Sequence, residues 1–162
     1  MPKTSTYPGG GKGNGGVGVP LANVTVYKRV VRPPGLGNLN ILAQHGNVSG
    51  SGLGDTIMTI NGVNIIKPTD LLTIDFFINA TFSGSPTQYL GIQFNNDIPV
   101  FIYMAESSNT LHRSTTRTAV QWGLSPGNYN IKLLGAQDGG IWTVSVNSNQ
   151  SVSEFNCLIH RG

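Results

Sequence analysis

The sequence predicts an all-β protein, an antiparallel β-sandwich of the jelly-roll kind that follows a glycine-rich N-terminal arm. Three observations favour this class. The 162 residues include 22 glycines and 9 prolines, and both residue types disfavour helix interiors. Beyond residue 20 the apolar residues alternate with a period of two, and turn residues recur every ~8–12 positions. No segment shows the helical periodicity that the crossovers of a parallel sheet require.

Residues 1–20 are expected to form the arm, and residues 21–162 the sandwich domain. The arm holds seven glycines and no hydrophobic periodicity, so it cannot bury enough apolar surface to offset its chain entropy. Gly11–Gly16 matches G-x-G-x-x-G, but it lacks the preceding strand and the following helix of a dinucleotide site. We therefore expect a flexible arm. Its composition fits equally an unstructured terminus and a segment that becomes ordered along a neighbouring subunit.

Positive charge is concentrated early in the chain. Residues 1–54 hold five Lys and Arg and no acid, whereas the rest holds five of them and seven acids. Nucleic acid is a disfavoured partner, because arms that bind it carry dense cation runs and each phosphate needs its own cation. An acidic protein surface is the favoured partner, and its contacts are expected from the arm and the basic first strand: Lys3, Tyr7, Lys12, Tyr27, Lys28, Arg29 and Arg32. A solvated strand edge explains the basic strand equally well.

Alternation defines the strands in order. They are expected over Ala22–Val31, Leu39–Ala43, Thr56–Ile60, Val63–Ile66, Leu71–Phe82, Tyr89–Phe94, Ile98–Met104, Thr115–Trp122, Tyr129–Leu134, Ile141–Val146 and Phe155–His160. Three segments are typical of hairpin turns because their residues accept positive φ: Asn61-Gly62, Asn95–Asp97 and Asp138-Gly139.

Bulky residues also occur on the faces opposite the main apolar sets. Phe77, Phe101 and Tyr103 are the clearest of them, in the strands Leu71–Phe82 and Ile98–Met104. Aromatic side chains on a nominally outer face indicate a subunit interface. A second sheet or a loop of the same chain that covers them is the alternative.

Groups that would carry chemistry are sparse. His45, His112 and His160 lie far apart in the sequence, and none has a second ligand at metal-binding spacing. Cys157 cannot form an internal disulfide and is expected to be a buried thiol. We expect no enzyme, no metal and no cofactor. With no apolar run of about 18 residues and no apolar leader, we also expect neither a membrane span nor a signal peptide.

The last strands show a recognisable order. Leu124–Leu134 combines a turn glycine with a tyrosine two residues later, and this tyrosine begins an alternating strand. The alternating segment Arg113–Trp122 precedes it, and the segments Trp142–Val146 and Glu154–Arg161 follow it. This order, over about the last fifty residues, resembles the C-terminal half of tumour-necrosis-factor-like and complement-like jelly rolls, especially those of bacteriophage virion proteins.

The resemblance implies a trimeric structural module on the surface of a virus particle, made in the host cytoplasm and bound to the major capsid protein or a neighbouring virion protein. A capsid decoration (cement) protein is the leading hypothesis, with a head fibre or tail fibre tip close to it. A lectin-like module is the alternative, contacting a cell-surface glycan through loops near Asn95–Asp97, Ser107–His112 or Gln137–Gly140. A small capsid protein that packages nucleic acid comes third, and an enzyme last.

Overall fold

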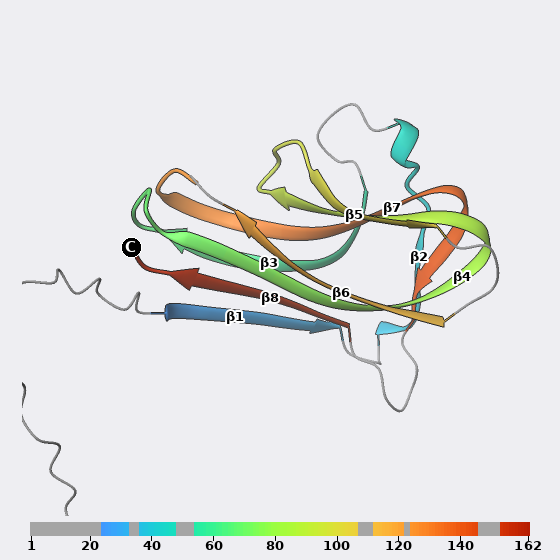
Figure 1. Cartoon of the computed structure of the whole chain (residues 1–162), viewed down its shortest axis with the longest axis horizontal. Coiled ribbons are helices and arrows are strands. Elements are labelled where there is room, and N and C mark those ends of the chain that lie inside the picture. Colours follow the sequence, from blue (N-terminus) through green and yellow to red (C-terminus); the bar gives the residue numbers. More distant parts are fainter. Residues whose placement is uncertain (1–23, 33–35, 48–53, 107–111, 122–123, 146–152) are drawn as a thin grey trace, which may run out of the picture.

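The computed structural model describes residues 24–32, 36–47, 54–106, 112–121, 124–145 and 153–162. The expected fold class is confirmed, since every ladder between its strands is antiparallel. The strands are β1 (Val24–Arg32), β2 (Leu39–Ile41), β3 (Asp55–Ile65), β4 (Leu71–Phe94), β5 (Val100–Glu106), β6 (His112–Gln121), β7 (Gly127–Val144) and β8 (Ser153–His160); a 3-10 turn, η2 (His45–Asn47), follows β2 (Figure 1). No helix in the described ranges is long and apolar enough to cross a membrane.

One continuous sheet supplies both layers of the sandwich, because β4 is 24 residues long and belongs to each. Its first part pairs with β6 and β8, and its second part pairs with β5 and β7. Ala80 lies opposite both Arg113 of β6 and Val144 of β7, so these two strands flank β4 on opposite sides. β1 then adds to β8, while β2 and β3 add to β7.

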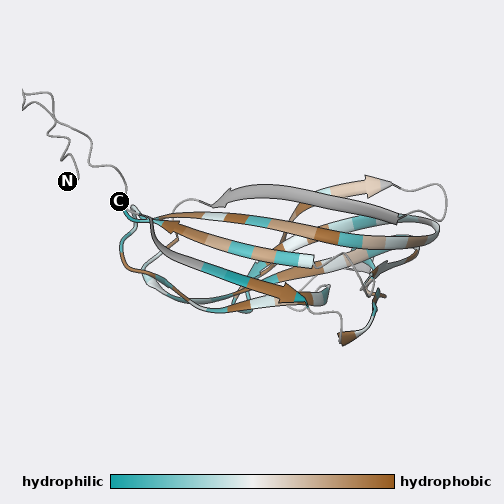
Figure 2. Ribbon diagram, turned by 90° about the horizontal axis from the view of Figure 1, so that it is seen from below, coloured by the Kyte–Doolittle hydropathy of each residue, from teal (hydrophilic) through white to brown (hydrophobic). Residues whose placement is uncertain are grey.

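The core forms as the alternation of β4 predicts. Its inward residues are at most 1% exposed: Leu72, Ile74, Phe76, Ile78, Ala80 and Phe82. They pack with apolar residues of the other strands, and the alternation of hydrophobic and hydrophilic residues is visible along the ribbons (Figure 2). Trp142 is fully buried, and its Nε1 donates to the Ala136 carbonyl at 2.8 Å. This bond satisfies the polar atom of the largest core side chain.

One expected hairpin is confirmed and two are wrong. Asn95 adopts φ 52° between β4 and β5, and the Asp97 amide donates to the Phe94 carbonyl. Asn61-Gly62 instead lies inside β3, and Asp138-Gly139 lies inside β7. The positive φ of each glycine there accommodates a register shift against the neighbouring strand rather than a chain reversal. The sheet therefore has fewer and longer strands than expected.

Candidate functional site

Strand β5 exposes large apolar side chains on an open edge of the sandwich. Ile98, just before it, is 74% exposed and Val100 is 54% exposed. In the described part of the chain β5 pairs with β4 alone. Val100 lies opposite the buried Ile92, so it faces the core side of the sheet but stands at its rim. We call Ile98 and Val100 the β5 edge.

A bulge in β5 separates two aromatic residues that simple alternation places together. Tyr103 pairs with Leu90 and packs against the core, whereas Phe101 pairs with Gly91 after the register shifts by one residue. The expectation that both lie on the outer face is therefore wrong for Tyr103. Phe77 is half-buried between two fully buried neighbours of β4, which places it on the outer face as expected. A role of these residues at a subunit interface stays a prediction.

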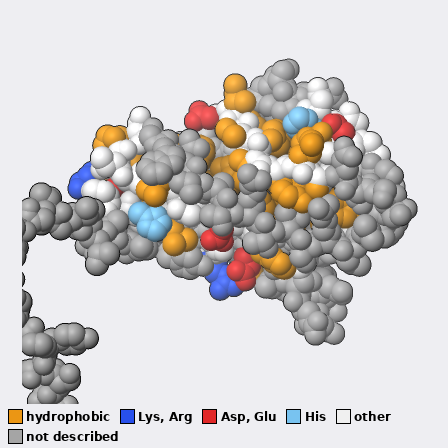
Figure 3. Space-filling model, viewed as in Figure 1, with side chains coloured by type: hydrophobic (Ala, Val, Ile, Leu, Met, Phe, Trp, Pro, Cys, Tyr) orange, Lys and Arg blue, Asp and Glu red, His pale blue; other side chains and the backbone are white. Residues whose placement is uncertain are grey.

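Three rings meet on the outer face of the sheet. The His45 ring stacks on Tyr89, with centroids 3.8 Å apart and planes 5° apart. The Phe101 ring lies nearly perpendicular to both, with its centroid 4.7 Å from that of His45 and 6.2 Å from that of Tyr89. These rings border a hollow of about 410 Å³, lined by His45, Tyr89, Phe101, Ile102, Tyr103 and Met104. We call it the aromatic hollow. Figure 3 shows hydrophobic side chains gathered around the histidine at the upper right.

Backbone hydrogen bonds fix the segment that carries His45. The Leu42 and Ala43 amides donate to Asp55 Oδ2, and the Gln137 amide of β7 donates to the Ala43 carbonyl at 2.8 Å. Asp138 adds a weaker hydrogen bond, since its Oδ1 accepts from the Gly46 amide at 3.4 Å. Because these bonds precede and follow the histidine, its ring is held over Tyr89 by the fold itself.

The floor of the hollow depends on a glycine. A Cβ at Gly91 would lie 3.0 Å from Phe101 Cδ1, closer than side chains pack. Phe101 therefore occupies the space that a side chain at position 91 of β4 would fill. Met104, opposite Tyr89 in the ladder, is 61% exposed at the rim of the hollow. The sequence shows these aromatic residues, but not that a bulge and a glycine bring them beside a histidine from another segment.

The three described cations among the expected docking residues contact groups of their own chain. Lys28 Nζ donates to the Asn61 carbonyl of β3 at 2.8 Å and to the Gly62 carbonyl. Arg29 pairs with Glu154 of β8, and Arg32 donates to the Gly37 carbonyl at 3.3 Å. The other expected contacts, Lys3, Tyr7 and Lys12, lie outside the described residues, as does the side chain of Tyr27. Docking through any of these residues stays a prediction.

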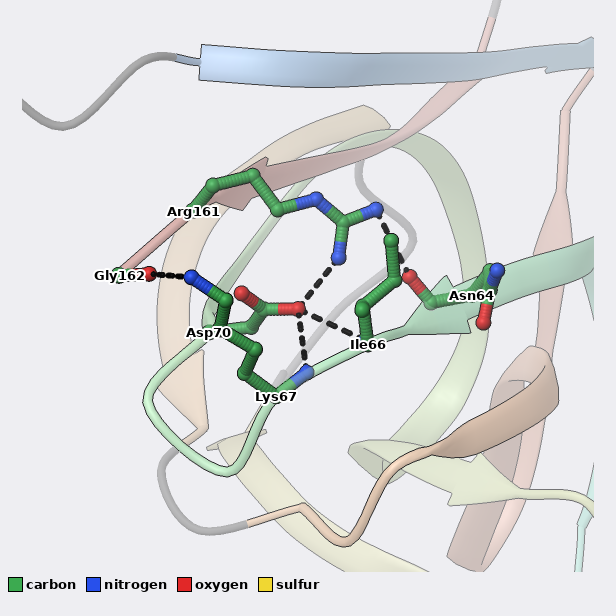
Figure 4. A network of polar contacts seen from close by, with 6 residues as sticks. All are labelled: Asn64, Ile66, Lys67, Asp70, Arg161 and Gly162. Atoms are coloured by element: carbon green, nitrogen blue, oxygen red, sulfur yellow. Dashed lines mark hydrogen bonds and ion pairs between the residues drawn. The ribbon is translucent and has the colours of Figure 1, made fainter.

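A buried carboxylate organises the end of the sheet where β3 passes into β4. Asp70 is 3% exposed, and its Oδ2 accepts from the Ile66 and Lys67 amides at 2.8 and 3.1 Å and from Arg161 (Figure 4). Arg161 also donates to the Asn64 carbonyl. Burial alone raises the pKa of Asp70, but the two amides and the guanidinium outweigh it, so this pKa lies below its usual value. No local pattern in the sequence indicates this network, because Asp70 and Arg161 are 91 residues apart.

The contacts of Asp70 Oδ2 join the turn between β3 and β4 to the segment after β8. Burial also raises the pKa of the Cys157 thiol to about 12, which keeps it protonated and unreactive. In the ranges that the structure describes, no three His, Cys, Asp or Glu side chains lie close enough to hold a metal ion.

The solved structures that this chain resembles include two from infectious bursal disease virus. The infectious bursal disease virus VP2 subviral particle is 13% identical with a TM-score of 0.45, and it covers 86% of this chain and 34% of that one. The structure of the Gx strain of infectious bursal disease virus is 12% identical with a TM-score of 0.39, covering 86% and 33%. The present chain thus spans about a third of the length of the chains that it matches. No family model and no curated protein matches the sequence.

Proposed function

We propose that this chain is a non-enzymatic structural protein of a virus particle, and that it works by adhering to other protein subunits. The observation that carries the proposal is the β5 edge, where an edge strand holds two large apolar side chains in solvent. Such edges associate readily, and soluble proteins normally protect them. The order of the last strands, which resembles bacteriophage virion jelly rolls, supports the assignment to a particle.

The finer form of the proposal is a trimeric capsid decoration protein. Its copies would bury the β5 edge against one another, and the N-terminal arm would attach the trimer to the major capsid protein. Lys28 and Arg29 already have partners within the chain, so we assign the main attachment to the arm and a smaller share to β1. A receptor-binding fibre tip remains the alternative, and the aromatic hollow is the feature that favours it.

The oligomeric state is tested by light scattering of the full chain at micromolar concentration. We expect the mass of a trimer, and we expect Val100→Asp to yield monomers because it buries a charge in the contact. Leu36→Asp is the matched control, since Leu36 is 62% exposed but is not part of β5. Thermal unfolding of each variant shows that the sandwich is intact. A monomeric natural chain, or equal masses for both variants, would contradict the proposal.

Attachment is tested separately with particles that lack this protein. The full chain should sediment with them, and a chain without residues 1–20 should remain in solution at unchanged melting temperature. Equal occupancy with and without the arm would refute a docking role for it. Sedimentation that fails for Arg29→Ala as well would assign part of the contact to β1.

A further inference from the structure

We propose that the aromatic hollow is a binding site for a neutral saccharide. This inference goes beyond the assembly role, since the proposed subunit contact uses the β5 edge, whereas the aromatic hollow lies on the outer face of the sheet. The hollow is an open depression of about 410 Å³, a volume within the range of small-molecule sites and large enough for one or two sugar rings. It is lined mainly by aromatic and apolar side chains with a few polar groups, as such sites usually are.

The rings are held in place before any ligand arrives. His45 lies flat on Tyr89, and its segment is bonded to Asp55 and to β7 on either side. Phe101 occupies the space above Gly91. A site whose side chains are already ordered loses little entropy on binding, and this matters most for ligands that gain little from each contact.

The chemistry of the lining selects among ligands. The weakly positive C–H face of a sugar ring is attracted to the negative face of an aromatic ring. The imidazole of His45, which lines the hollow and is partly exposed, supplies a hydrogen-bonding group for sugar hydroxyls. The side chain of His45 is 34% exposed, so the stack is open to solvent on one side.

The charged groups near the hollow narrow the class of saccharide further. Asp138 Oδ2 lies 4.0 Å from His45 Nδ1, and the Asp138 side chain is 43% exposed. Among the described residues the lining contains no Lys or Arg, so a sialylated or phosphorylated ligand would meet a carboxylate without a compensating cation. A neutral sugar meets an acceptor for its hydroxyls instead. We therefore commit to neutral saccharides rather than acidic ones.

The test is saturation-transfer NMR on the full chain with lactose, cellobiose, maltose, N,N′-diacetylchitobiose and mannobiose, and with 3′-sialyllactose as the acidic comparison. We expect transfer to at least one neutral disaccharide and none to 3′-sialyllactose. His45→Ala and Phe101→Ala should each weaken that binding at least tenfold. Leu36→Ala, at an exposed apolar residue outside the hollow, should leave it unchanged. Melting temperatures confirm that each variant is folded.

Two cationic probes test the competing occupants. Tetramethylammonium reports a cation site built from the rings and Asp138, and a synthetic peptide of residues 1–20 reports docking of the arm of a second copy. If either probe binds in a His45-dependent manner while no neutral disaccharide does, the saccharide assignment is wrong. It is also wrong if all probes fail, or if binding persists unchanged in both hollow variants.

The same variants separate this inference from the proposed function. His45 is not part of β5, so His45→Ala should abolish saccharide binding and leave the trimer mass unchanged. Val100→Asp should dissociate the trimer and leave saccharide transfer in place. Loss of saccharide binding alone then overturns only the site, and loss of the trimer alone overturns only the assembly role.

Discussion

Replacing Asp70 by alanine tests whether one buried carboxylate holds the turn between β3 and β4 to the segment after β8. The substitution leaves the Ile66 and Lys67 amides without their acceptor, and it leaves Arg161, whose side chain is only 17% exposed, without its counter-charge. Removing one partner of a buried ion pair costs about 3–5 kcal/mol. For a chain of this length each kcal/mol lowers the melting temperature by about 2–4 °C, so a decrease of roughly 10 °C is expected.

The assay is thermal and urea unfolding at neutral pH, with Asp97→Asn as the control because Asp97 is exposed in the β4–β5 turn. Asp70→Asn keeps the shape and one acceptor, so its loss should be smaller than that of Asp70→Ala. A loss below about 1 kcal/mol for Asp70→Ala, the level of an exposed ion pair, would refute the reasoning.

The pH dependence gives an independent check. The pKa of Asp70 is lowered in the folded chain, so the folded state favours its ionised form. Its contribution is fully present above the ordinary carboxyl pKa of about 3.9 and is lost as the pH falls through the lower, folded value. The natural chain should therefore lose stability over this acid range, and Asp70→Asn should lose less there. Parallel acid profiles would show that Asp70 is not the group responsible.

Three further predictions concern buried contacts. Gly135→Ala should destabilise the fold by about 1–3 kcal/mol, because the new Cβ would lie 2.8 Å from Trp142; urea unfolding measures this, and an unchanged midpoint would contradict it. Gly91→Ala should displace Phe101 and weaken saccharide transfer, whereas normal transfer would show that the ring needs no glycine beneath it. Cys157 should resist iodoacetamide at pH 8 until the chain is unfolded, since its pKa is about 12; rapid labelling of the native chain would exclude a buried thiol.

Local alternation was enough to predict the fold class and the core of β4. Every second residue from Leu72 to Phe82 is buried, because a strand covered on one face imposes a period of two. The Asn95–Asp97 turn was likewise predictable, since its residues tolerate the backbone angles of a tight reversal. These features depend on neighbours in the sequence, and sequence patterns report such neighbours directly.

Features set by the partner strand were not predictable. Asn61-Gly62 has the composition of a hairpin turn, but β7 continues past it, so β3 stays paired and its one extra residue forms a bulge. A similar shift opposite Gly91 turns Tyr103 toward the core. The aromatic hollow depends on the same long-range geometry, because the pairing of β2 with β7 brings His45 next to Tyr89. Asp70 and Arg161, 91 residues apart, offered no local signal.

The placement of the β1 cations changes how adhesion is best explained. Their position within residues 1–54, which hold no acidic residue, favoured docking on an acidic surface. In the structure, however, Lys28 of β1 donates hydrogen bonds to the bulge of β3. Releasing it to a partner would exchange two exposed hydrogen bonds for the new contact, so docking through Lys28 would give little net stabilisation. Arg29 is more exposed than Glu154, and exposed pairs contribute little, so it exchanges partners more readily. The proposed adhesion is therefore assigned first to the apolar β5 edge, which can make a contact without breaking any of these bonds.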